Sequence, residues 1–497
     1  MLLALLPLIS IMFMIFVLKK SSIFTGIVAC MLTAAIALSP IFNSNIMNLT
    51  EPIIKSFLTT SIIAYILFFG IFLFHLMDKA GAINGIASTI TKATNDKIYQ
   101  ILILALGLSP LIESVSGFGL AVIVIAPLLI ALGFSPIQSS LIALVSLCII
   151  PWGTLAMGTI IGATLGNVEL DKMGMGSALM CIPIYIYYAL VVVYIGVGLS
   201  ALKKRLFTIL FVGFLLGASV WLCNRFISVE LAGLFGSLAV ISVLFFIIKQ
   251  QNKKTSSTSK LEKESNSIKN IMPYLLLIVL LFISRIVIPL KEYLSDTWTL
   301  TIEKYNFELS ILYSPGFFLF IVCIFTIFFY RLQAFEIRES SISTFRKCYP
   351  VILTTFLYVV VSEIMSEAKM IQLLSLLAAQ SFGQFYVFIS PLVGAIGGFL
   401  TGSNTASNTM FIRLQTETAL HIGMSPILVA CAQNVSSSLM TMVNPSRVAL
   451  SCSVCKIRSH ENEIQKKMLF VGIGTLAIIL IELLLLFIFQ YINGFGV

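Results

Sequence analysis

The amino-acid sequence predicts an all-α polytopic membrane protein. Hydrophobic residues make up 59% of its 497 positions and charged residues only 10%, whereas an ordinary soluble domain is about a quarter charged. The chain also contains many apolar runs of about 20 residues, the length that spans a bilayer. Inside lipid each backbone N–H and C=O must be paired within its own helix, so these runs predict transmembrane helices.

The apolar runs divide into simple spans and two longer, interrupted regions. Residues 2–18 form the first span, which is predicted to stay as an anchor because no basic stretch precedes it and no small-residue cleavage site follows it. Further simple spans lie near 22–42, 57–77, 178–200, 206–223, 229–248, 270–290, 314–330, 348–366 and 468–490. Gly, Pro, Ser, Thr and Asn interrupt the regions 98–166 and 384–452 repeatedly, so these do not divide into simple spans.

Lys and Arg gather in alternate loops, which places those loops in the cytoplasm. The alternation holds if each interrupted region contains one re-entrant hairpin and one broken full span. We therefore predict about 12 spans plus two re-entrant hairpins, with both termini outside. The hairpins are expected at 98–133 and 384–422, entering from opposite faces, with tips near Ser116 and Asn404. The positive loops account for the net charge of +10, so no nucleic-acid partner is needed.

The chain is predicted to contain two halves, 1–249 and 270–497, joined by a polar cytoplasmic linker at 250–269. Segments of the first half match the second in the same order: 113–117 with 403–407, 133–137 with 423–427, and Pro151 with Pro445. The predicted topology runs the span before the first interrupted region inward and the span before the second outward. The halves are therefore expected to be two inverted repeats.

Inverted repeats with matching interrupted segments are typical of secondary transporters, whose site lies near the bilayer midplane. The free N–H ends of a broken helix carry about half a positive charge, so they can hold a carboxylate without a fully buried cation. No P-loop or metalloprotease motif is present. The pattern predicts a non-enzymatic secondary transporter of a small organic anion. A non-transporting sensor or receptor remains an alternative, and an intramembrane serine hydrolase is a distant third.

The interrupted regions also resemble the signatures of the L-lactate permease family. Residues 111–136, LIESVSGFGLAVIVIAPLLIALGFSP, look like its glutamate-small-small-small-GFG signature, and residues 397–415, GGFLTGSNTASNTMFIRLQ, are similar to its second signature, which 424–445 continue. The resemblance implies proton-coupled transport of lactate, glycolate or a related 2-hydroxy monocarboxylate across a bacterial-type cell inner membrane. The expected partners are this anion, a proton and membrane lipid, with no cofactor.

Four positions depart from the family pattern. The family usually has Asp at Asn404, Asn at Cys148, Gly-Gly-x-x-Gly at 436–441, and Gln after the second proline, where Ser446 and Arg447 stand here. These changes alter two polar groups and one carboxylate at the expected site. A carrier for a different carboxylate is therefore a second alternative.

The four breaks supply the candidate site residues. Glu113, within an apolar region, is the candidate proton carrier, or else a neutral acid that ties the hairpin tip together. The candidate substrate-binding residues are Ser114, Ser116, Gly117, Phe118, Gly119, Pro151, Thr154, Gly402, Ser403, Asn404, Thr405, Ser407, Asn408, Gln433, Asn434, Asn444, Pro445 and Arg447.

Some of these residues have a plainer interpretation. The short polar side chains of 403–408 could cap the broken backbone instead of binding substrate, and Arg447 could be a cation that reaches toward the membrane surface. Glu363 and Arg413 are expected to be interfacial. The CxxC spacing at 452–455 lacks a second pair of ligands, so no metal site is predicted.

Overall fold

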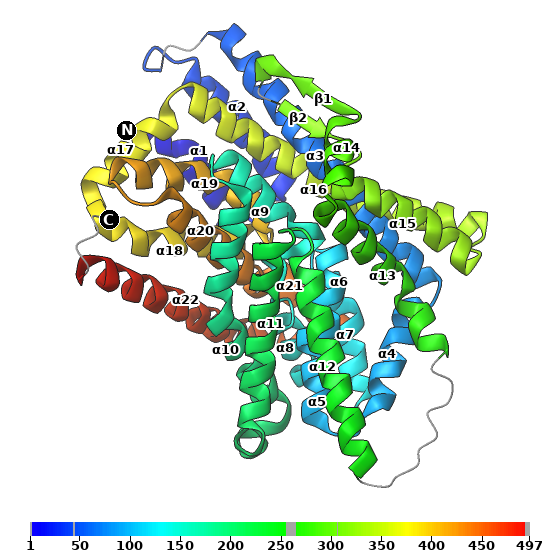
Figure 1. Cartoon of the computed structure of the whole chain (residues 1–497). Coiled ribbons are helices and arrows are strands. Elements are labelled where there is room, and N and C mark those ends of the chain that lie inside the picture. Colours follow the sequence, from blue (N-terminus) through cyan, green and yellow to red (C-terminus); the bar gives the residue numbers. More distant parts are fainter. Residues whose placement is uncertain (1, 43–44, 255–264, 306, 493–497) are drawn as a thin grey trace.

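The computed structural model describes residues 2–42, 45–254, 265–305 and 307–492 (Figure 1). Apart from one antiparallel hairpin of β1 (Thr299–Ile302) and β2 (Phe307–Ser310), these residues form helices joined by short turns. Ten of the described helices are long and apolar enough to cross a membrane, or up to eleven if one bent pair is a single span. The all-α polytopic class is thus confirmed.

The finer count of twelve spans depends on shorter apolar helices, and it stays a prediction. The helices outside the repeated part of the chain are α1 (Leu2–Phe16), α2 (Ser22–Ala37), α11 (Leu206–Phe226), α12 (Ala232–Lys254), α13 (Ser265–Ile286), α14 (Ile288–Asp296) and α15 (Pro315–Tyr330). Helices α1, α2 and α15 have only 15, 16 and 16 residues. The linker predicted at 250–269 falls largely on residues 255–264, which lie outside the described part of the chain.

The remaining helices form two sets with the same order of elements. The first set is α3 (Ile46–Lys79), α4 (Ala82–Ala93), α5 (Lys97–Ile103), α6 (Ser109–Ser116), α7 (Leu120–Ala131), α8 (Pro136–Val145), α9 (Gly153–Leu165) and α10 (Leu170–Lys204). The second set is α16 (Ala334–Glu367), α17 (Met370–Phe382), α18 (Tyr386–Thr401), α19 (Asn404–His421), α20 (Pro426–Met440), α21 (Pro445–Val454) and α22 (Glu461–Ile492). Each set runs as a long helix, a short helix, a helical hairpin, a broken helix and a final long helix.

The two sets exchange equivalent contacts. Helix α3 packs along α16, α9 packs on α19 as α21 does on α7, and α10 packs on α20 as α22 does on α8. Reciprocal contacts of this kind are typical of a two-fold related pair. In Figure 1, α6, α9 and α21 lie near the centre of the molecule, while α15 and α22 lie at its edges. The inversion of the two sets across the membrane stays a prediction.

Each predicted re-entrant region folds back on itself as a helical hairpin. In hairpin 1 (residues 97–131), α5, a π-helical turn at Leu104–Leu108 and α6 lead to a tip at 117–119, from which α7 returns. Its ends meet because Lys97 donates a hydrogen bond to the Leu132 carbonyl. In hairpin 2 (residues 386–421), α18 and α19 run antiparallel, and Gln415 Nε2 donates to the Ser390 carbonyl at 3.1 Å.

The breaks have backbone conformations that a continuous helix cannot contain. At the tip of hairpin 1, Gly117, Phe118 and Gly119 have φ angles of 62°, 55° and 77°. In the first broken helix, a 57° bend separates α8 from the segment that begins at Ile150. There Thr154 has a φ of 41°, which is costly for a β-branched side chain. The chain therefore interrupts its helices at the positions where the sequence predicts interruption.

Candidate functional site

Arg447 lies where the two hairpin tips meet. It extends from the first turn of α21, and its Nη2 donates a hydrogen bond to the Gly402 carbonyl at 2.9 Å. A Cβ atom built on Gly119, at the other tip, would lie 3.7 Å from Arg447 Nε. The side chain is buried, and Nη1 has no hydrogen-bond partner among the described residues. An unpaired guanidinium nitrogen therefore lies at the junction of the two tips.

Glu113 lies one turn before the tip of hairpin 1 and folds back onto it. Its Oε1 accepts a hydrogen bond from the Gly119 backbone N–H at 2.9 Å. The side chain is only 1% exposed, and Oε2 has no partner in the described part of the chain. Arg447 also lies beside Gly119, although no ion pair of the described residues joins it to Glu113. Both groups thus turn toward Gly119 and keep one polar atom free.

The broken helix of each set holds the hairpin tip of the same set. A Cβ atom built on Gly117 would lie 2.1 Å from Thr154 Oγ1, and a Cβ atom built on Gly402 would lie 2.9 Å from Asn444 Cγ. Asn444 also links two helix ends, since its Nδ2 donates to the Phe399 carbonyl at 2.7 Å and its Oδ1 accepts from the Ser446 N–H at 3.0 Å. The glycines at the tips allow this close approach because any side chain would collide.

A cavity of about 270 Å³ opens beside the tips, against α16 and the start of α2. Its lining residues are Ser21, Ser22, Ile23, Phe118, Pro350, Val351, Thr354, Thr355, Thr401, Gly402, Ser403 and Ala406. The lining thus combines hydroxyl groups with apolar side chains, and both tips contribute. Liquid water occupies roughly 30 Å³ per molecule, so the cavity has room for a small organic acid.

Several predicted substrate residues instead cross-link helices. Asn434, on α20, accepts hydrogen bonds at 2.9 Å from the side-chain amides of both Asn404 and Asn408. Its own amide donates to Thr159 Oγ1 at 3.0 Å and to Ser177 Oγ at 3.1 Å. We call these five residues the asparagine cluster. It is buried and absent from the cavity lining, so its members join α9, α10, α19 and α20.

Other predicted residues also lie away from the cavity. The hydroxyls of Ser114 and Ser116 donate to carbonyls of their own helix at 2.7 Å and 2.8 Å. Ser407 accepts from Gln433 Nε2 at 3.3 Å between hairpin 2 and α20. Three more predicted residues are absent from the lining: Pro151, whose carbonyl accepts from Thr159, Pro445, which begins α21, and Thr405, which is buried.

Sequence reasoning missed the wall of the cavity that the hairpins do not form. Thr354 and Thr355 are neighbours on α16, while Ser21 caps α2 and Ser22 begins it. The paired threonines inside the apolar span 348–366 were the available signal, because adjacent hydroxyl residues are exceptional there. Thr354 and Thr355 line the cavity only because α16 packs against the tips.

Glu363 and Arg413, which are predicted to be interfacial, form a partly buried ion pair. Arg413 Nη2 lies 2.7 Å from Glu363 Oε1, and Arg413 Nε donates to the Leu165 carbonyl at 3.3 Å. This contact ties α16 and α19 to the end of α9. For metal binding, no group of three or more His, Cys, Asp or Glu side chains comes together among the described residues.

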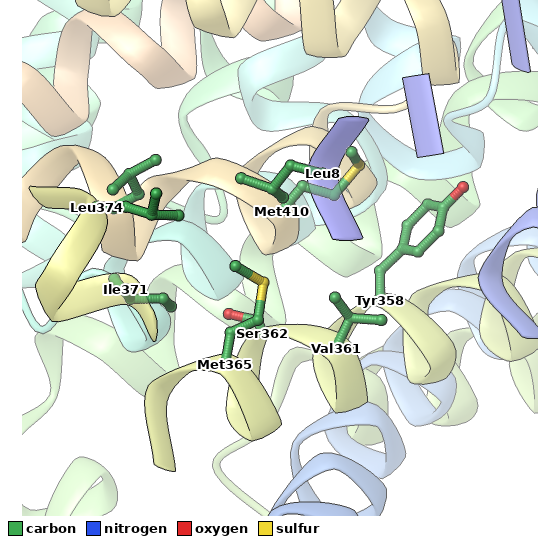
Figure 2. Close-up of a pocket in the computed structure, with 9 residues that line it drawn as sticks. Leu8, Tyr358, Val361, Ser362, Met365, Ile371, Leu374 and Met410 are labelled. Atoms are coloured by element: carbon green, nitrogen blue, oxygen red, sulfur yellow. The ribbon is translucent and has the colours of Figure 1, made fainter. Parts of the chain in front are cut away.

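A second, much smaller cavity of about 10 Å³ lies between α1, α16, α17 and α19 (Figure 2). Its lining residues are Leu8, Tyr358, Val361, Ser362, Met365, Ile371, Leu374, Met410 and Leu414. This volume accommodates about one water molecule, and the walls are almost wholly apolar. It is therefore a packing defect between helices and not a second ligand site.

A family model and several curated proteins match most of the chain. The family model described as L-lactate permease matches residues 1–491. The chain is 25% identical over 378 residues to the L-lactate permease of Streptococcus iniae, covering 74% of this chain and 80% of that protein. It is 22% identical over 507 residues to the L-lactate permease of Escherichia coli (strain K12), covering 91% and 90%. Among solved structures, the YdaH transporter of Alcanivorax borkumensis matches with a TM-score of 0.47 and 12% identity, covering 87% of this chain and 85% of that one.

Proposed function

This chain belongs to the L-lactate permease family, and we propose that it carries a short 2-hydroxy monocarboxylate such as lactate or glycolate together with a proton. The family is one of multi-pass bacterial membrane transporters and not of enzymes. The relatives are distant, at 22% to 25% identity, so the substrate belongs to the proposal. The location of the protein in the cell inner membrane is also part of the proposal.

The observation that carries the proposal is the unpaired Nη1 of Arg447 at the junction of the tips. A guanidinium binds a carboxylate through two parallel N–H groups, and a buried donor without a partner favours such a ligand strongly. Arg447 is not itself part of the cavity lining, but the neighbouring tip residues Phe118 and Gly402 are. The proposed substrate therefore places its carboxylate at Arg447 and its remaining atoms in the cavity.

The rest of the cavity suits a hydroxyl and a short carbon chain. Hydroxyls of Thr354, Thr355 and Ser403 are available as partners, and no charged side chain belongs to the lining described above. An acid held by one guanidinium and two or three hydrogen bonds binds with roughly −4 to −8 kcal/mol, which is millimolar to micromolar affinity. Such an affinity still allows release on the other side of the membrane.

Glu113 is the proposed proton carrier, since neither tip contains another acidic residue. The proposed transport cycle exposes the tips alternately to the two sides of the membrane. The reciprocal packing of the two helix sets supports it, because two-fold related halves are suited to two equivalent open states. The proposed topology keeps twelve spans, two inverted repeats in 1–249 and 270–497, and both termini outside.

Uptake into proteoliposomes tests the proposal directly. The purified chain is reconstituted and supplied with labelled lactate, glycolate, malate or citrate under an imposed pH or sodium gradient. We expect lactate or glycolate to accumulate when the outside is acidic, and a protonophore to abolish this accumulation. Uptake driven only by sodium, or only of malate and citrate, would contradict the proposed coupling or substrate. No uptake of any acid would favour a sensor.

A further inference from the structure

We propose that Arg447 is shared between two anions, the Glu113 carboxylate and the substrate carboxylate, so that each anion binds together with one proton on Glu113. This inference rests on the proposed transport function and specifies how its two ligands are linked. Arg447 is then the cation that balances the negative charge of either carboxylate. Glu113 then acts through Arg447 and does not need to touch the substrate.

Glu113 and Arg447 both lie against Gly119. Glu113 Oε1 accepts from the Gly119 N–H at 2.9 Å, and Arg447 Nε lies 3.7 Å from the Cβ position of Gly119. One guanidinium nitrogen is occupied by the Gly402 carbonyl, while Arg447 Nη1 and Glu113 Oε2 both lack partners among the described residues. The site therefore has one cation, one acid and free hydrogen-bonding capacity on each.

Charge balance then links the two ligands. Arg447 and Glu113 are 7% and 1% exposed, so water compensates neither charge well, and an unbalanced buried charge is strongly unfavourable. Without substrate, ionised Glu113 balances Arg447. An incoming carboxylate would leave a net negative charge unless Glu113 takes up a proton. Substrate binding and protonation of Glu113 therefore favour one another, and by thermodynamic linkage they do so equally.

Among the described residues packed against Glu113, no other group is placed to take over this role. The elements packed around α6 include α7, α9 and the turn at Ile150–Trp152, and none of these contains a titratable side chain. Helix α3 presents Gly70 to the Val115 carbonyl, and α12 presents Gly233 to Ser114. Besides Arg447, the titratable group that interacts with Glu113 is the buried thiol of Cys148. With one cation and one acid, the expected ratio is one proton for each anion.

Calorimetry of L-lactate binding to the purified full-length chain, in buffers with different ionisation enthalpies, counts the protons taken up. Above the pH at which Glu113 titrates, we expect one proton per anion and an apparent Kd that rises about tenfold per pH unit. In Glu113→Gln the side-chain oxygen can still accept from Gly119, but proton uptake should vanish and Kd should stop depending on pH. Arg447→Lys should bind more weakly and still take up one proton, since it keeps the charge.

The outcomes separate this inference from the transport function. Lactate binding by the wild type without proton uptake, or unchanged pH dependence in Glu113→Gln, would overturn the shared-charge inference and leave anion transport standing. Binding of neither lactate nor glycolate by the wild type would overturn the proposed function itself. Glu113→Asp keeps a titrating carboxylate and should retain proton uptake, so it tests the role of Glu113 if the Gln variant fails to fold.

Discussion

Replacing Asn434 by alanine removes the centre of the asparagine cluster. The Asn404 amide loses the partner that lies at 2.9 Å, whereas Asn408 keeps the Gly158 carbonyl at 2.9 Å and Thr159 keeps the Pro151 carbonyl at 2.6 Å. A stranded buried donor costs about 1–3 kcal/mol. The other lost interhelical hydrogen bonds cost about 0.6 kcal/mol each in a membrane protein. We expect Asn434→Ala to lower the free energy of unfolding by about 3–5 kcal/mol.

Unfolding of the purified protein by SDS, followed by circular dichroism, measures this loss. Ser437→Ala is the matched control, because Ser437 is buried on the same helix and its hydroxyl has no partner among the described residues. This control should change the free energy of unfolding by less than about 0.5 kcal/mol. Lactate should stabilise Asn434→Ala as much as it stabilises the wild type. An equal effect of the two substitutions would refute the cross-linking role, and loss of lactate stabilisation in Asn434→Ala alone would make Asn434 a substrate ligand.

Three further predictions concern the tips and the cavity. Gly402→Ala should abolish uptake, because its Cβ would lie 2.9 Å from Asn444 Cγ. Gly81→Ala should retain it, because Gly81 has the same left-handed conformation but nothing within 4 Å of its Cβ position; equal uptake by both variants would contradict this. Thr354→Val should raise the KM for lactate severalfold and leave that for propionate unchanged, since propionate has no hydroxyl; a parallel rise in both would exclude a hydroxyl contact. Ser403→Ala removes an N-cap bond to Ala406 and should destabilise the protein by about 0.5–2 kcal/mol besides weakening lactate affinity, and unchanged unfolding in SDS would contradict the capping role.

The breaks were predictable from the sequence because they are local. Gly, Pro and short polar residues interrupt the sequence pattern of an apolar helix. The expected tips at Ser116 and Asn404 accordingly lie next to the observed breaks at 117–119 and 402–403. The number of transmembrane spans was harder to predict from the sequence. Helices α1, α2 and α15 are shorter than a bilayer requires by length alone, and their placement depends on neighbouring helices.

The division of polar residues between cavity and packing could not be read from the sequence. Asn434 inside a helix contact and Ser403 beside a cavity are both polar residues in apolar surroundings. Their difference arises from which helix lies opposite, and this depends on the packing of the two sets. The same reason explains why Thr354 was missed, since α16 reaches the tips only in the folded protein. Arg447 was identified because a lone cation at a break is exceptional in itself.

The reciprocal packing of the two helix sets has a consequence for biosynthesis. Helices α9 and α10 have partners within the first half, but α19 and α20, on which they also pack, belong to the second set, which leaves the ribosome more than two hundred residues later. Until then Thr159 and Ser177 lack Asn434, the side chain that joins them, and the face of α9 that carries Gly158 has no helix against it. We therefore expect the packing of α9 and α10 to be completed only after α19 and α20 have been translated.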